Sequence, residues 1–433
     1  MSKKREKIYI FAFLLLVSVL LISSCGKQAE EIQYPAAEPP ATASPRPVKM
    51  QQTEKPEETP EPTESPEPEP EYFTISMIGD CTLASSQHHK GIAESFENTI
   101  AGDYSWPFSG TVQYFENDDL TMANLECILS DSDLYGSSTF FFRAPAEYTE
   151  ILKKGSVELV TVANNHTFDC GQQGLDDTVS ALDAAGITSV GENECIIYET
   201  ESGLKIGIYC AYSGFMPSVQ QTVTGIEKLR GQGAELIIAA YHWGNEGYYN
   251  VSASQEEVGR AAIDAGADIV YGSHPHVLER VEEYNGGYIY YSLGNWSFGG
   301  NTMPRDRDTV IARVTVMRDV DGSISISGTE LIPCSLSSTP GINDYRPVPY
   351  EPDSEGYART LSKLDGSYSG PNLTIDYSAF HENEEEGQQD EPPELTTEAG
   401  SSSEGVQPGT PASEVPAAEV PVELQSSTGE ETA

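Results

Sequence analysis

The chain has 433 residues, of which 68 are acidic and 24 are Lys or Arg, so its formal net charge is −44. This charge excludes nucleic acid as a default partner, because binding to phosphate backbones depends on Lys and Arg contacts. Seven cysteines are too few for a disulfide scaffold. A hydrophobic content of 38% is low for a fully packed chain of this length, so we expect part of it to be disordered.

Residues 1–25 have the pattern of an export signal. A basic start is followed by the apolar run 8–22, and the small residues Ser23 and Ser24 stand directly before Cys25. This order resembles a bacterial lipobox, in which the cysteine is lipidated after cleavage. We therefore expect Cys25 to anchor the chain to the extracytoplasmic face of the cell membrane. An ordinary N-terminal membrane anchor is the alternative.

Two further segments have a strongly biased composition. Residues 26–71 are rich in Pro and Glu, and residues 381–433 are acidic, with Ser, Thr, Pro and Gly between the acids. Repulsion between like charges and the extended preference of proline predict a semi-rigid linker in the first segment. The second is predicted to be a disordered tail, either solubilising or able to bind cations or cell-wall components.

The globular part is predicted at 72–350, with a C-terminal extension at 351–380. Short apolar runs recur here without strict alternation, as in strands buried on both faces. Helical spacing lies between them, at Leu175, Val179 and Leu182 and after Ser254, which we expect to form a capping box with Glu257. Strands that alternate with helices predict an α/β fold, in which ligands bind at the carboxyl ends of the strands.

Those strand ends carry the side chains that bind metals. Imidazole suits transition metals, and carboxylate and amide oxygens complete a harder site. Each such residue alone is more often a hydrogen-bonded core residue, but the set is evidence for one shared site. The histidine pair at 88–89 lacks this context and is interpreted as surface. The candidate ligands, sufficient for two divalent ions, are Asp80, Glu126, Asn165, His242, His274 and His276.

The order of these motifs resembles a known family. The chain is similar to the CapA family of poly-γ-glutamate capsule synthesis proteins, within the calcineurin-like metallophosphoesterase superfamily. The resemblance implies a sandwich of two facing β-sheets flanked by helices, and a dinuclear centre of Mn, Fe or Zn type. It is carried by Gly79-Asp80, Asn124-Leu125-Glu126, Ala163-Asn164-Asn165-His166, His242-Trp243-Gly244, Gly272-Ser273-His274-Pro275-His276 and Tyr291-Ser292-Leu293-Gly294-Asn295.

The resemblance also implies roles for single residues. Asp80 and His276 correspond to ligands of one ion. The other ion is assigned Asn165, His242 and His274, with Glu126 in the bridging position. His166 corresponds to the histidine that contacts the leaving oxygen.

Three more residues are candidates around this centre. Asp169 is expected to orient His166 by a hydrogen bond. Arg143 is a candidate clamp for an anionic substrate, with a surface salt bridge nearly as plausible. Asn295, in the last motif, is expected to bind substrate.

The sequence departs from the wider phosphoesterase pattern, which opens with Asp-x-His. Here Asp80-Cys81-Thr82 lacks that histidine, and Glu126 replaces a second aspartate, so one metal site has fewer ligands. Three functions stay open: a role in capsule or envelope-polymer synthesis or export, with membrane proteins of that system as partners; a general extracytoplasmic phosphoesterase; and a non-catalytic scaffold. The substrate would be an anionic polymer or a phosphoester.

The cysteines divide into two groups. Cys81, Cys127 and Cys170 each follow a residue of the proposed site and are interpreted as small core residues. If Ser202 and Gly203 form a two-residue hairpin turn, Cys195 and Cys210 face each other across the strands. A disulfide is then possible outside the cell, although a bridge straight across paired strands is often strained.

Overall fold

The computed structural model describes residues 68–134, 136 and 140–375. The predicted signal and lipidated Cys25, nearly all of the linker and the acidic tail lie outside these residues. Within the described part, no helix combines the length and the apolar character needed to cross a membrane.

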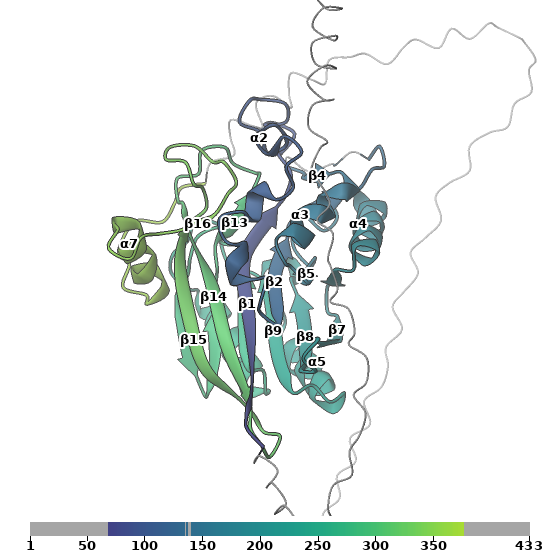
Figure 1. Cartoon of the computed structure of the whole chain (residues 1–433), viewed down its shortest axis with the longest axis vertical. Coiled ribbons are helices and arrows are strands. Elements are labelled where there is room, and N and C mark those ends of the chain that lie inside the picture. The colour runs from purple at the N-terminus through teal and green to yellow at the C-terminus, as the bar shows by residue number, and fades with distance from the viewer. Residues whose placement is uncertain (1–67, 135, 137–139, 376–433) are drawn as a thin grey trace, which may run out of the picture. The chain divides into compact units, whose positions relative to one another are not determined.

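Two β-sheets form the centre of the molecule (Figure 1). The first has the order β16-β15-β14-β1-β2-β5-β6, with β13 also paired to β1; the second has the order β11-β12-β10-β9-β8-β7. In the first sheet β1, β2, β5 and β6 are parallel, and in the second β8, β9, β10 and β12 are parallel.

The strands of the first sheet are β1 (Glu71–Thr82), β2 (Leu120–Leu125), β5 (Leu159–Thr161), β6 (Thr188–Val190), β13 (Asn295–Phe298), β14 (Asp308–Arg318), β15 (Ile324–Ser335) and β16 (Val348–Pro349). The strands of the second are β7 (Cys195–Glu199), β8 (Lys205–Ala211), β9 (Leu236–His242), β10 (Ile269–Ser273), β11 (Val281–Tyr284) and β12 (Gly287–Tyr290). A separate small ladder pairs β3 (Ile128–Leu129) with β4 (Arg143–Ala144).

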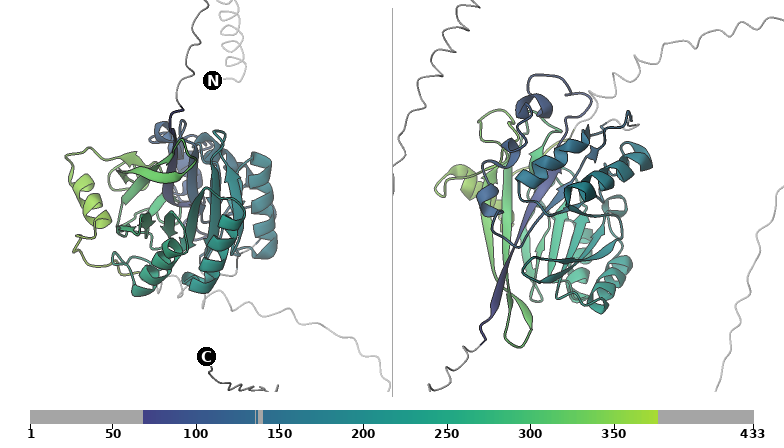
Figure 2. Two further views of the ribbon diagram at one scale, coloured as in Figure 1. Left: turned by 90° about the horizontal axis from the view of Figure 1, so that it is seen from below. Right: turned by 45° about the vertical axis from the view of Figure 1, so that its right-hand side comes forward.

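Helices cover the outer faces of the sheets (Figure 2). The α-helices are α2 (Phe96–Ile100), α3 (Thr149–Lys154), α4 (Gly171–Ala185), α5 (Val219–Gly231), α6 (Ala253–Asp264) and α7 (Glu355–Leu364). Short 3₁₀ turns are η1 (Trp106–Phe108), η2 (Val112–Tyr114), η3 (Ala146–Tyr148) and η4 (Ser213–Phe215). Helix α4 ends at Gly186, whose left-handed backbone conformation is typical of the residue after a helix.

The apolar residues form three layers of core. The central layer joins the facing sheets, with Ile75 and Met122 from the first sheet and Ile208 and Ile238 from the second. A second layer lies between the first sheet and α3 and α4, and a third lies between the second sheet and α5 and α6. This arrangement buries β2, β9 and β10 on both faces. The predicted α/β sandwich of two facing sheets flanked by helices is confirmed.

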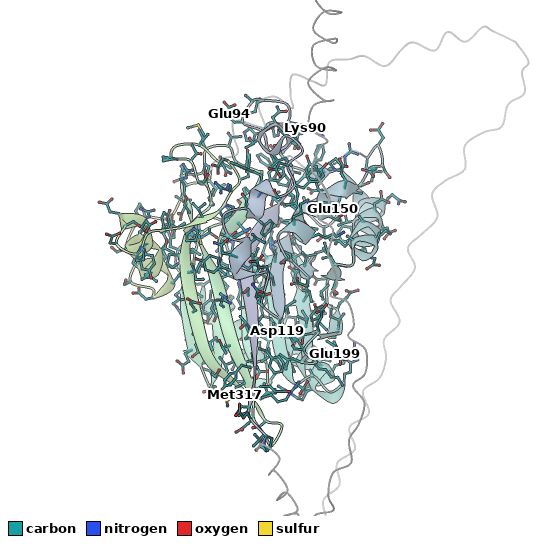
Figure 3. All side chains as sticks on the ribbon, viewed as in Figure 1. Lys90, Glu94, Asp119, Glu150, Glu199 and Met317 are labelled. Atoms are coloured by element: carbon teal, nitrogen blue, oxygen red, sulfur yellow. The ribbon has the colours of Figure 1, made fainter. Side chains whose placement is uncertain are left out.

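The parallel strands place their carboxyl ends at one end of the molecule. Figure 3 shows Lys90 and Glu94 toward this end of β1, and Asp119, Glu199 and Met317 toward the opposite end. The histidines at 88 and 89, expected on the surface, are half-buried instead. His89 Nδ1 lies 3.3 Å from Ser86 Oγ, and the ring of His88 packs edge-on against Phe140.

The register of the β7–β8 hairpin differs from the prediction by one residue. Glu199 pairs with Lys205, and the amide of Thr200 donates to the Leu204 carbonyl, so three residues rather than two form the turn. A shift of one residue moves a side chain to the other face of the sheet. Cys210 therefore lies in the core between the sheets, whereas Cys195 contacts α5, and both are free thiols. The disulfide hypothesis is wrong.

Two further expectations concern local structure. The cap of α6 is Ser252, which forms a capping box with Gln255, so the assignment of the cap to Ser254 was two residues late. Cys81, Cys127 and Cys170 are buried, as expected of small core residues.

Gly79 of β1 approaches the backbone of Gly294 closely. A Cβ on Gly79 would lie 1.9 Å from the Gly294 carbonyl oxygen, and one on Gly272 of β10 would lie 2.0 Å from the Tyr291 carbonyl oxygen. These contacts involve backbone atoms, which cannot rotate away as a side chain can. Both lie one or two residues from a candidate metal ligand.

We expect Gly79→Ala to lower the free energy of unfolding by about 3 kcal/mol, the upper end of typical overpacking costs. Urea denaturation followed by circular dichroism measures this. The matched control is Gly231→Ala at the end of α5, where an added Cβ meets nothing within 4 Å. That variant should be stabilised by roughly 0.5 kcal/mol. Equal midpoints for the two variants would show that the approach at Gly79 is not tight.

Candidate metal centre

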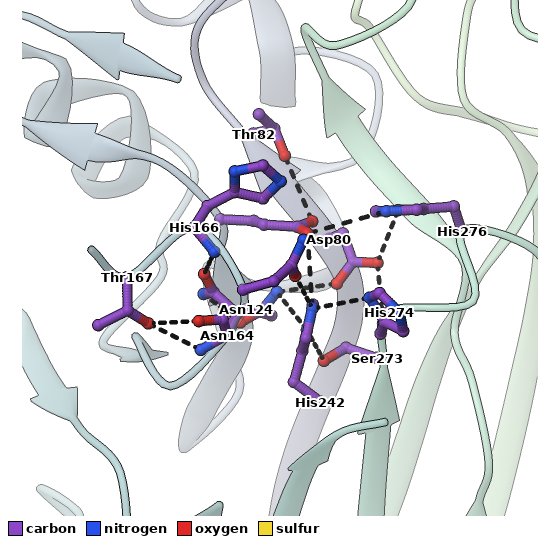
Figure 4. Close-up of polar contacts among 12 residues, drawn as sticks. Asp80, Thr82, Asn124, Asn164, His166, Thr167, His242, Ser273, His274 and His276 are labelled. Carbon is purple, nitrogen blue, oxygen red and sulfur yellow. Dashed lines mark hydrogen bonds and ion pairs between the residues drawn. The ribbon is translucent and has the colours of Figure 1, made fainter. Parts of the chain in front are cut away.

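The six candidate ligands come together at the carboxyl ends of five strands. Figure 4 labels four of them, Asp80, His242, His274 and His276. Asp80 lies near the end of β1, and Glu126 directly follows β2. His242 is the last residue of β9, and His274 and His276 follow β10. Segments far apart in the sequence therefore contribute to one buried cluster. The ladder of β1 is irregular on both sides of Asp80, where the pairing with β2 and with β13 shifts register. Such bulges re-aim a side chain at the edge of a site.

One half of the cluster is formed by Asn165, His242 and His274. Nε2 of His242 lies 2.6 Å from the side-chain oxygen of Asn165 and 3.1 Å from Nδ1 of His274. The three donors converge on one point at the end of the second sheet. This is the group assigned to one ion by the family resemblance.

The other half is formed by Asp80 and His276, and Glu126 joins the two. Oδ2 of Asp80 lies 3.3 Å from Nδ1 of His276. Oε1 of Glu126 lies 3.5 Å from Nε2 of His242 and 3.8 Å from Nε2 of His276. Ligand atoms of Glu126, His274 and His276 all lie within 4.8 Å of one another. Glu126 thus has the central place that a bridging carboxylate needs.

The environment of the Glu126 carboxylate indicates whether these residues fit a cation. Its carboxylate is completely buried, and Oε1 accepts no hydrogen bond. A buried carboxylate oxygen without a donor is costly, because its lost hydration is not replaced. A divalent ion between the histidines would satisfy this oxygen. The donor set of imidazole, carboxylate and amide oxygen suits such an ion.

Burial and charge shift the pKa values in the cluster in two directions. Burial, with the neighbouring histidines, lowers the pKa of His274 to about 2 and that of His242 well below its usual value. Both imidazoles are therefore neutral, which is the form that binds metals. For His276, burial acts downward, but the charges of Glu126 and Asp80 prevail and raise its pKa to about 10. Burial raises the pKa of Glu126 as well. The cluster therefore retains protons at neutral pH.

A layer of hydrogen bonds orients the candidate ligands. The Ser273 hydroxyl donates to the Tyr241 carbonyl at 3.2 Å, so its oxygen can accept the Nδ1 proton of His242 at 2.9 Å. This tautomer leaves the Nε2 lone pair of His242 free for an ion. The Asn124 amide donates to Oδ1 of Asp80 at 2.9 Å, and Oδ1 of Asn295 lies 2.9 Å from Nδ1 of His276.

Backbone strain marks the same place. His274 has a φ of 98° and His276 a φ of 56°, values in the region that favours glycine. Residues other than glycine rarely adopt these φ values, because their Cβ atom clashes with the backbone. Residues held in such strained conformations are often found at functional sites. The Ser-His-Pro-His segment is thus held in a conformation that its own preferences oppose, because the surrounding contacts determine it.

His166 lies at the rim of the cluster rather than inside it. Its Nδ1 is 2.8 Å from Oδ2 of Asp169, which is the orienting contact expected from the sequence. The same carboxylate oxygen accepts the backbone N–H of Phe142 at 2.8 Å, so Asp169 is itself fixed. With Nδ1 engaged in this way, Nε2 of His166 is the nitrogen available to a substrate.

A cavity of about 430 Å³ opens beside His166, His276, Asn165 and Asn295. Arg143 is not among its lining residues; its guanidinium donates to the backbone carbonyl of Ser132. The arginine in the wall is Arg305, and the acids are Glu246 and Asp306. Sequence reasoning missed these three, since none follows a strand in a motif. The spacing His242-x₃-Glu246 is the local signal that could have pointed to Glu246.

Comparison with known proteins found a matching family model and similar curated proteins. The family model described as "Bacterial capsule synthesis protein PGA_cap" matches residues 74–299, more than half of the chain. The capsule biosynthesis protein CapA of Bacillus anthracis is 28% identical over 324 residues, covering 69% of this chain and 70% of that protein. The PGA biosynthesis protein CapA of Bacillus subtilis is 28% identical over 228 residues, covering 48% of this chain and 57% of that protein.

Among solved structures, the Haemophilus influenzae NAD nucleotidase (NadN) matches with a TM-score of 0.36 and 14% identity, covering 73% of this chain and 67% of that chain. A likeness of this degree carries no argument about substrate or reaction.

The retained protons predict how ion binding depends on pH. A cation that binds His276 displaces a proton held with a pKa of about 10, so its affinity should rise with pH and level off above that value. Between pH 7 and 9 we expect at least about a tenfold gain per pH unit, because at least one proton leaves per ion.

Calorimetric titration of Mn²⁺ in buffers of different ionisation enthalpy counts the released protons. His276→Gln should release fewer protons and show a smaller dependence on pH. An affinity that is constant over this pH range in the unmodified chain would contradict the prediction.

Proposed function

Because the chain belongs to the bacterial capsule synthesis protein PGA_cap family, we propose that it is an accessory protein in the synthesis or export of poly-γ-glutamate or a related envelope polymer. The names of the CapA relatives in two Bacillus species support this role. Membrane proteins of the same synthesis system are the expected partners.

We infer that the cluster at the strand ends holds divalent ions, at most two. One ion would bind Asn165, His242 and His274, and the other Asp80 and His276, with Glu126 between them. The observation that carries this inference is the completely buried Glu126, whose Oε1 accepts no hydrogen bond and faces two histidines. Bound divalent ions of this kind polarise a phosphoryl or acyl oxygen and lower the pKa of bound water.

The residues around the cluster support hydrolysis of a phosphoester-type bond. His166 is the general acid, with its Nε2 proton directed to the leaving oxygen. Asp169 accepts the Nδ1 proton at 2.8 Å and so orients the ring, and the proton donated from Nε2 is that of the doubly protonated imidazolium. Asn295 fixes the orientation of His276 rather than acting on substrate alone. A scaffold without activity would need no such His–Asp pair at the rim of a cavity.

The metal content of the purified chain, measured by mass spectrometry, tests the first part of the proposal. We expect about one to two equivalents of a transition metal per chain, the range that this donor set allows. His274→Ala should lose most of it, because it removes a ligand and leaves the neighbouring donors disordered. His89→Ala is the control, since it removes a half-buried histidine outside the cluster. Full metal content in His274→Ala would overturn the assignment of His274.

Turnover of a generic aryl phosphate tests the second part. His166→Gln should lower kcat by roughly 10²–10⁴-fold, the usual contribution of a positioned general acid, with the metal content unchanged. Asp169→Asn should lower kcat less and alter its pH profile, because it misorients the ring without removing it. Metal-loaded chain that turns over no phosphoester would favour the scaffold function.

We also propose that the chain is anchored through Cys25 to the extracytoplasmic face of the membrane. The support is the order of basic, apolar and small residues before this cysteine. In bacteria that express the full chain, radiolabelled palmitate should enter the natural protein and not Cys25→Ser, which should accumulate as precursor. Cys195→Ser, at a half-buried thiol, is the matched control and should label normally. Equal labelling of Cys25→Ser would reject the anchor.

A further inference from the structure

The cavity beside the cluster has two chemically different sides. Its polar side contains Asn165, His166, His276 and Asn295, and Glu246, Asn301, Arg305 and Asp306 also contribute to the lining. The remaining side is apolar, and we call it the apolar wall. The wall consists of Phe140, Phe142, Phe298, Pro304, Leu373 and Ile375.

The apolar wall begins directly at the catalytic histidine and the candidate ligand. The ring of Phe142 packs edge-on against His166 with 4.7 Å between centroids, and the ring of Phe298 lies 4.9 Å from that of His276. Phe142 and Phe298 also contact each other at 6.3 Å. A group attached to an anion at the cluster can therefore contact aromatic carbon directly beside it.

The outer part of the wall comes from the C-terminal end of the described chain. The amide of Leu373 donates to the Gly247 carbonyl at 2.9 Å, and the amide of Tyr249 donates to the Asn372 side chain at 3.1 Å. Arg305 donates to the Thr374 carbonyl. A Cβ on Gly247 would lie 2.9 Å from Cβ of Leu373, so this segment lies tightly against the loop after β9.

Helix α7 fixes the segment to the rest of the cavity. Lys363, near the end of α7, is buried and binds Asp306 at 2.6 Å and Asp308 at 2.7 Å. Asp306 itself lines the cavity. Residues 372–375 are thus held by contacts with the loop after β9, with Arg305 and, through α7, with Asp306. They form a fixed part of the cavity wall.

Leu373 and Ile375 differ from core residues in one respect. Ile375 keeps 38% of its surface exposed and Leu373 is half-buried, although both face the cavity. When a ligand covers exposed apolar surface next to a polar reactive centre, the burial of that surface favours binding. The charged groups of a polyacid would lose hydration against this wall without gaining partners.

We propose that the substrate of this site is an anion bonded to an apolar group, aliphatic or aromatic, and that Leu373 and Ile375 determine how large that group is. The inference rests on the proposed function, since the anion is placed at the metal cluster. It adds the chemical class of the substrate and two specificity-determining residues outside the segment that the family model matches.

The test uses alkylphosphonates from methyl to octyl, which share one anionic group and are not hydrolysed. Their dissociation constants are measured by calorimetry on the full chain loaded with Mn²⁺. We expect the dissociation constant to fall by about fourfold for each methylene that becomes buried, until the alkyl group of the ligand reaches the end of the apolar wall. The double variant Leu373→Ser with Ile375→Ser should end the gain at a shorter alkyl length, because Phe142 and Phe298 remain, and should leave the affinity for methylphosphonate unchanged. Unchanged methylphosphonate binding also shows that the variant is folded.

Two controls define the role of the wall. Leu373→Met with Ile375→Leu keeps the apolar surface and should keep the series, and Val320→Ser removes an exposed apolar side chain in the β14–β15 turn and should change nothing.

The outcomes separate the two proposals. Tight methylphosphonate binding with no gain along the series overturns the substrate class alone. A series that keeps its full length in the double Ser variant overturns the assignment to Leu373 and Ile375. No binding by any phosphonate overturns the proposed function, and the substrate class with it.

Discussion

The structure depends on the burial of two carboxylates at the meeting point of two sheets. Asp80 and Glu126 have no exposed surface, and one oxygen of Glu126 receives no hydrogen bond. Two negative charges in such a place are strongly unfavourable unless positive charge balances them. The imidazole of His276, with its raised pKa, supplies part of that balance. The Asn124 side chain supplies a further donor to Asp80. The architecture around the site is consistent with a cation supplying the rest.

Close backbone contacts keep this arrangement in place. The approaches of Gly79 to Gly294 and of Gly272 to Tyr291 join β1 and β10 to the segment before Asn295. Because each glycine lies within two residues of a candidate ligand, the packing of backbone on backbone sets the positions of the ligands. The cluster is therefore positioned mainly by the rigid sheets. The short loops after the strands need only orient the side chains that directly follow them. This division fits the general finding that precise sites are built on regular elements.

The sequence was sufficient for the fold class and for the residues that meet in the cluster. Buried strands that end in His, Asn or an acid are visible as apolar runs with a polar stop, and β9 ending at His242 is an example. Features that depend on one residue of register were not predictable in this way. The β7–β8 turn contains three residues, so Cys195 and Cys210 lie on opposite faces. Neither Arg305 nor Leu373 carries a local signal, because the cavity wall forms only when α7 packs on β14 and β15.

The left-handed backbone at His274 and His276 has a consequence for how this protein can change. Glycine or asparagine at either position would relax the backbone, but each would remove an imidazole from the cluster. Selection for thermal stability and selection for the proposed ion binding would therefore act against each other at these two positions. A screen for heat-resistant variants that does not measure ion content would select substitutions that remove these imidazoles from the cluster. Ancestral or consensus substitutions in this segment should accordingly be judged by what they bind as well as by their melting temperature.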